Sequence, residues 1–110
     1  MKQLNAALLQ IAPMKSLEEN LEKGLESCRK ARDMGADIAL FPEMWSCGYR
    51  IYDRPREEWI REAIPADGAF AEAFREAAAS LRMAIGVTLL EACETGPKNS
   101  LLLFDRNGQK

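Results

Sequence analysis

The stretch GADIALFPEMWSCGY, residues 35–49, decides the fold. Its residues 37–41 (DIALF) form an apolar run of strand length, and Pro42 ends the run because proline cannot donate the hydrogen bond that a central strand needs. Gly35, just before the run, is a typical helix stop. We therefore expect a helix, a tight turn and a buried strand in this order, followed by an irregular loop over residues 42–55.

Another apolar run and an amphipathic pattern precede this stretch. Residues 4–11 (LNAALLQI) lie between polar residues and Pro13, which is typical of a strand buried on both faces. Ser16 stands three residues before Glu19, a capping-box pattern, and apolar residues then recur at helical spacing until Gly35. Strand, helix and strand predict a βαβ unit with two parallel strands.

Two further helices and two further strands are expected after the loop. The later helix is apolar along one face, and both strands are short runs bounded by turn residues. The predicted ranges are 56–63 and about 67–81 for the helices, and 83–90 (MAIGVTLL) and 99–104 for the strands.

The last residues, 105–110 (DRNGQK), begin with a strong hairpin-turn signal and leave only two residues after it. A return strand is missing, and native proteins usually avoid or protect such an unpaired sheet edge. We therefore expect residues 1–110 to be the N-terminal part of a single α/β domain that is truncated after its fourth strand. An ordinary frayed tail is the alternative.

Composition excludes several kinds of protein. Fifteen basic and seventeen acidic residues give a net charge of -2, so nothing in the bulk charge predicts nucleic acid or an anionic membrane as partner. No run approaches the roughly 20 apolar residues that cross a bilayer. The three cysteines form no C-x-x-C pair and the N-terminus lacks a signal-peptide pattern, which predicts a cytoplasmic protein with reduced thiols. The absence of histidine excludes His-activated nucleophiles and His-based zinc sites.

Glu43 is the strongest candidate for a chemical role. It follows a buried strand and a proline, at the edge of an open α/β sheet where ligands bind. A carboxylate held there can act as a general base. On position alone, a solvated loop glutamate remains the commoner explanation.

The wider sequence pattern favours a catalytic role for Glu43 over a solvated loop glutamate. FPEMWSCGY at residues 41–49, preceded by GADIALF and by the opening LNAALLQI run with its capped helix, resembles the nitrilase, or carbon-nitrogen hydrolase, superfamily. The likeness continues through MAIGVTLLE and the Asn99-Ser100 step into LLLFDRNGQK, so it spans nearly the whole chain. It implies the front part of a nitrilase-like α-β-β-α sandwich with a mixed sheet, and it puts the glutamate of the family's Glu-Lys-Cys triad at Glu43.

The resemblance also implies an activity, the hydrolysis of non-peptide carbon-nitrogen bonds in small-molecule amides or nitriles, amides being favoured, through a thioester acyl-enzyme. In that mechanism cysteine attacks, lysine stabilises the developing negative charge and glutamate moves protons. The family's lysine and cysteine lie beyond residue 110, so this chain supplies only Glu43 and is expected to be inactive alone. No cofactor or metal is implied, and the complete protein is expected to be a homo-oligomer.

Two kinds of residue could be mistaken for the missing partners. Cys47 is four residues from Glu43, but its position in the family lies in the glutamate loop, so we expect a bystander thiol. Lys98 and Lys110 are interpreted as turn and terminal charges.

A different class of function stays open. The chain could be a non-catalytic split-gene half or interaction fragment that pairs with another polypeptide, and the unpaired edge after Phe104 motivates that alternative.

Overall fold

The computed structural model describes residues 3–49 and 53–110, and its centre is one mixed β-sheet with the strand order β1-β2-β3-β4. β1 pairs parallel with β2, β2 pairs parallel with β3, and β3 pairs antiparallel with β4. The strands are β1 (Ala6–Leu8), β2 (Ile38–Leu40), β3 (Ala84–Glu91) and β4 (Lys98–Phe104). The helical segments are α1 (Leu17–Asp33), α2 (Arg56–Trp59), the 3-10 helix η2 (Ile60–Glu62) and α3 (Ala69–Leu81). The α/β class, the mixed sheet and the βαβ unit are confirmed.

The boundaries of α1 follow from its capping residues. The Ser16 hydroxyl accepts a hydrogen bond from the Glu19 N–H at 3.1 Å, which satisfies one of the free donors of the first turn. At the other end Gly35 has φ 89°, and its N–H donates to the Arg32 carbonyl at 2.9 Å. Both predicted ends of this helix are therefore correct.

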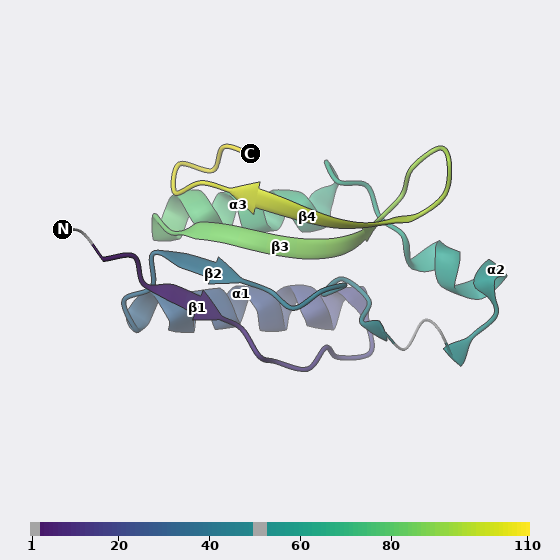
Figure 1. Ribbon diagram of the computed structural model, residues 1–110, viewed down its shortest axis with the longest axis horizontal. Coiled ribbons are helices and arrows are strands. Elements are labelled where there is room, and N and C mark those ends of the chain that lie inside the picture. Colours follow the sequence, from purple (N-terminus) through teal and green to yellow (C-terminus); the bar gives the residue numbers. More distant parts are fainter. Residues whose placement is uncertain (1–2, 50–52) are drawn as a thin grey trace.

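Both long helices lie on the same face of the sheet. Figure 1 shows α1 and α3 behind the strands, and alternate strand residues such as Ala39, Ile85 and Leu102 are buried against them. The expectation of a first strand buried on both faces is wrong for the described chain, because no element covers the opposite face and Leu8 on that face is 67% exposed. β1 is also shorter than the apolar run that predicted it.

The uncovered face carries an apolar row that crosses the sheet. Leu8 pairs with Leu40, Leu40 with Gly86, and Gly86 with Leu103. The leucines of the row and the neighbouring Leu101 are all exposed, by 38% at the least. A contiguous exposed apolar patch of this kind is typical of a surface that packs against another part of a protein or a partner.

An aromatic cluster joins the segment after β2 to the helices. The Phe41 ring lies 5.4 Å from that of Trp45 and 5.2 Å from that of Phe74 on α3, measured between centroids. These rings come so close to α1 that a Cβ atom at Gly24 would stand 2.8 Å from both Phe74 Cζ and Trp45 Nε1. A glycine at this position is what lets the segment dock on the helix.

The other predicted elements form with small changes. The helix predicted over residues 56–63 divides into α2 and η2, and residues 50–52 of the predicted loop lie outside the described residues. The turn at residues 105–108 is present, since the Gly108 N–H donates to the Asp105 carbonyl at 2.9 Å. Figure 1 shows the last residues folding back over α3, and Gly108 packs there against Arg75 and Ala79. Among the helices of the described residues, none has the length and apolar content to cross a membrane.

Candidate active site

The loop after β2 brings Glu43 to the surface between two buried side chains and the strand end. Met44 has φ 61°, a left-handed conformation that reverses the chain, and the Gly48 N–H closes the turn on the Met44 carbonyl at 2.6 Å. Met44 and Trp45 are each 1% exposed, while Glu43 is exposed. The buried neighbours therefore fix the backbone and leave the carboxylate in the open.

One hydroxyl on β3 hydrogen-bonds to the backbone before and after Glu43. Thr88 Oγ1 donates to the Pro42 carbonyl and accepts from the Trp45 N–H at 2.9 Å. Thr88 is 7% exposed, so water competes little for either bond. The backbone on either side of Glu43 is thus tied to the same point of the sheet.

A second pair of polar residues holds the far half of the loop. The Asn20 side chain on α1 donates to the Ser46 carbonyl at 3.1 Å, and the Asn20 carbonyl accepts from Trp45 Nε1 at 2.9 Å. The Ser46 hydroxyl in turn accepts from the Leu90 N–H at 3.0 Å. Asn20 and Ser46 are both buried, which is rare for polar side chains unless they are hydrogen-bonded in this way.

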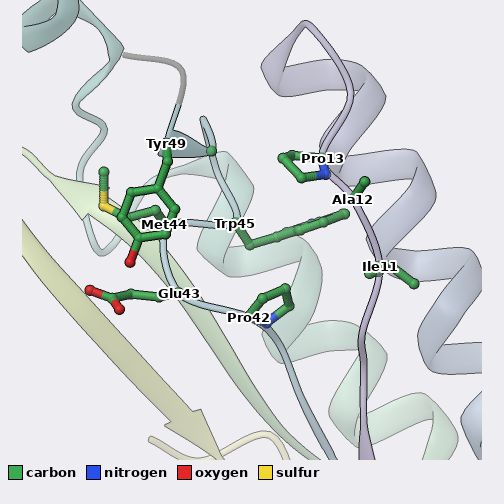
Figure 2. A pocket seen from close by; sticks show the side chains of 9 residues that line it. Ile11, Ala12, Pro13, Pro42, Glu43, Met44, Trp45 and Tyr49 are labelled. Carbon is green, nitrogen blue, oxygen red and sulfur yellow. The ribbon is translucent and has the colours of Figure 1, made fainter. Parts of the chain in front are cut away.

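The Glu43 carboxylate itself has a partner on β4. Asn99 Nδ2 donates a hydrogen bond to Glu43 Oε1. Glu43 is also one of the residues that line a cavity of about 340 Å³. Figure 2 shows Glu43 and Tyr49 on one side of it and the segment from Ile11 to Pro13 on the other. The lining residues are Ile11, Ala12, Pro13, Pro42, Glu43, Met44, Trp45, Gly48 and Tyr49.

The cysteines lie away from this cavity. Cys47 lines a different hollow, together with Arg54 and Glu62. Burial raises the pKa of the Cys47 thiol, and a hydrogen bond with Ser46 opposes that rise in part. Burial also raises the pKa of Cys28, on the core side of α1, to about 12. Neither thiol lines the cavity at Glu43, and a raised pKa disfavours the reactive thiolate form of both.

The sequence identified some of these residues and missed others. The position of Glu43 at the carboxyl end of β2 is as expected, and no lysine or cysteine is among the residues that line its cavity. Lys98 was interpreted as a turn charge; it is exposed, but it is the first residue of β4 and not part of the turn before that strand. Thr88, Asn99 and the buried Asn20 were not recognised as parts of the site. Of these three residues, only Asn99 had been noted in the sequence, as part of the Asn99-Ser100 pair in the family resemblance.

Residues 5–110 match the Carbon-nitrogen hydrolase family, and the chain belongs to that family.

The chain is similar to a curated protein and to several proteins of known structure. Glutamine-dependent NAD(+) synthetase from Thermotoga maritima is 42% identical over 50 residues, which make up 44% of this chain and 9% of that protein. An amidase from Nesterenkonia sp. superposes with a TM-score of 0.68 at 22% identity, covering 96% of this chain and 40% of that one. The C. elegans NitFhit protein gives a TM-score of 0.77 at 20% identity, covering 96% of this chain and 27% of that one. The chain therefore spans less than half the length of each of these proteins.

Proposed function

We propose that this chain supplies the general base, Glu43, of a hydrolase that cleaves non-peptide carbon-nitrogen bonds. The observation that carries the proposal is the setting of Glu43: the residue is exposed, it lines a cavity of about 340 Å³, and Thr88 hydrogen-bonds to the backbone on both sides of it. Such fixation suits a catalytic group, because its rate depends on how accurately it is positioned.

The chemistry requires a nucleophile and an electrostatic partner from outside residues 1–110. Glu43 takes the proton of a cysteine thiol, the sulfur attacks the carbonyl carbon, and a lysine stabilises the oxyanion. The carbon-nitrogen bond then breaks, and the nitrogen leaves with the proton that Glu43 returns. Water attacks the resulting thioester while Glu43 accepts its proton, the acid leaves, and the thiol is restored. Because the cavity beside Glu43 is lined by neither lysine nor cysteine, residues 1–110 alone are expected to be inactive.

Amides are the proposed substrate class in preference to nitriles. The curated relative from Thermotoga maritima is by name a glutamine-dependent enzyme, and glutamine carries a primary amide. The cavity beside Glu43 is lined mainly by apolar side chains and prolines, which suits a small, uncharged acyl group.

The test is Glu43→Gln in the full-length protein, assayed with small primary amides. The substitution keeps the shape and the hydrogen-bond acceptor but removes the base, so the acylation rate is expected to fall at least about a hundredfold. Intact-mass measurement follows the acyl-enzyme directly. Acylation of the variant at the normal rate removes the assigned role from Glu43. Thiol-dependent amide hydrolysis by residues 1–110 alone contradicts the need for outside partners.

The uncovered sheet face favours a second candidate. The exposed row that contains Leu8, Leu40 and Leu103 suits a non-catalytic fragment that pairs with another polypeptide. The gene distinguishes the two candidates. An in-frame continuation that encodes a lysine and a cysteine at strand ends supports the hydrolase, and a separate adjacent reading frame supports a paired fragment.

A further inference from the structure

We propose that Asn99 is a positioning residue for Glu43, fixing one oxygen of its carboxylate and thereby the direction in which the other oxygen is presented. The inference rests on the proposed function of Glu43 as a general base. It concerns a residue 56 positions away in the sequence, on the outer strand β4.

The contact is the outermost of the hydrogen bonds that hold the loop to the sheet. Thr88 of β3 points to the uncovered face, since its strand neighbours Val87 and Leu89 are buried against the helices. Asn99 of β4 points to the same face, because it pairs with Leu90, two residues after Thr88. The loop therefore extends from the end of β2 over β3, where Thr88 holds its backbone, and reaches β4, where Asn99 meets the carboxylate.

The two contacts have different effects on the glutamate. Thr88 bonds only backbone atoms, so it sets the position of the Glu43 Cα but leaves the side chain free to rotate. Asn99 Nδ2 bonds Oε1 and therefore limits that rotation. A carboxamide suits this task because its nitrogen is a neutral donor. It orients the carboxylate without competing as a base and without forming an ion pair.

A base that must take a proton at one point and return it at another depends on orientation, and a misplacement of about 1 Å can reduce a rate by roughly a hundredfold. Loss of the Asn99 donor should therefore act on the chemical step. It should leave substrate binding nearly unchanged, because Asn99 is not among the residues that line the cavity.

The experiment compares three variants of the full-length protein with Glu43→Gln, using a small primary amide as substrate. Asn99→Ala removes the donor, and Asn99→Gln retains an amide donor on a longer side chain. Ser100→Ala is the matched control, because it deletes a hydrogen bond from the next residue of β4 to a different glutamate, Glu91. We expect Asn99→Ala to lower kcat by about ten- to a hundredfold with KM within about twofold, from the cost of misorientation. Asn99→Gln should recover part of that loss, and Ser100→Ala should stay within about twofold of the wild type.

A second measurement does not depend on activity or on the folding of the alanine variant. In the wild-type protein the side-chain amide protons of Asn99 should show the NMR shift of a hydrogen bond to a carboxylate, and Glu43→Gln should move them. Unchanged Asn99 resonances in that variant overturn the proposal. A normal kcat in Asn99→Ala, with Glu43→Gln inactive, also overturns the proposal about Asn99. That result leaves the proposed function of Glu43 intact. Normal activity in Glu43→Gln removes the proposed function, and the role of Asn99 with it.

Discussion

Thr88→Val tests whether one hydroxyl fixes the backbone around Glu43. Valine has nearly the shape of threonine, so the core of the sheet keeps its packing and only the two hydrogen bonds to Pro42 and Trp45 are lost. The Trp45 N–H then has no partner in a buried setting, which costs about 1–3 kcal/mol. A loss of about 2 kcal/mol raises the open fraction of the loop by roughly thirtyfold, since each 1.4 kcal/mol corresponds to a factor of ten.

Hydrogen exchange followed by mass spectrometry measures this opening. We expect amide exchange over residues 42–48 to accelerate by about thirtyfold in Thr88→Val, while α3 exchanges as in the wild type. Thr88→Ser is the matched control, because it retains the hydroxyl and loses only a methyl group, worth about 0.8 kcal/mol. Equal exchange over residues 42–48 in the valine and serine variants refutes the reasoning, since the hydroxyl is then not what holds the loop.

Two further predictions concern the packing beneath the site. Gly24→Ala should lower the free energy of unfolding by about 1–3 kcal/mol, because the new methyl group stands 2.8 Å from atoms of Phe74 and Trp45. This overpacking outweighs the better helix propensity of alanine. An unchanged melting temperature of the variant contradicts the prediction. Burial raises the pKa of Cys28 from 9.0 to about 12, so the unfolded chain loses this proton first and the free energy of unfolding should fall between about pH 9 and pH 12, by at most about 1.4 kcal/mol per pH unit. Urea unfolding under reducing conditions should show a flatter pH dependence for Cys28→Ala than for the wild type, and equal slopes overturn the assignment.

Local patterns in the sequence predicted the elements well, because their causes are local. The Ser16 cap and the Gly35 stop defined α1, and Pro42 marked the end of β2. The position of Glu43 followed from the same signals together with the family resemblance. The burial of the first strand was wrongly predicted, since an apolar run has the same appearance whether or not anything covers its second face.

Local sequence patterns could not predict the hydrogen bonds that shape the site. Thr88 lies 43 residues from Trp45, and Asn99 lies 56 residues from Glu43, so only the register of β3 and β4 against the loop brings them together. A lone asparagine or threonine on a strand carries no sign of its partner. The buried Asn20 was equally hidden, because an asparagine on a helix is most often solvated.

The hydrogen bonds around the Glu43 loop have a consequence for the order in which the protein is made. Among the described residues, the side chains that hydrogen-bond to the loop lie between Asn20 on α1 and Asn99 on β4. Because chains emerge from the ribosome N-terminus first and fold as they emerge, the glutamate can be set in its geometry as soon as β4 has been synthesised. Residues translated after β4 therefore meet a Glu43 carboxylate that is already in its place.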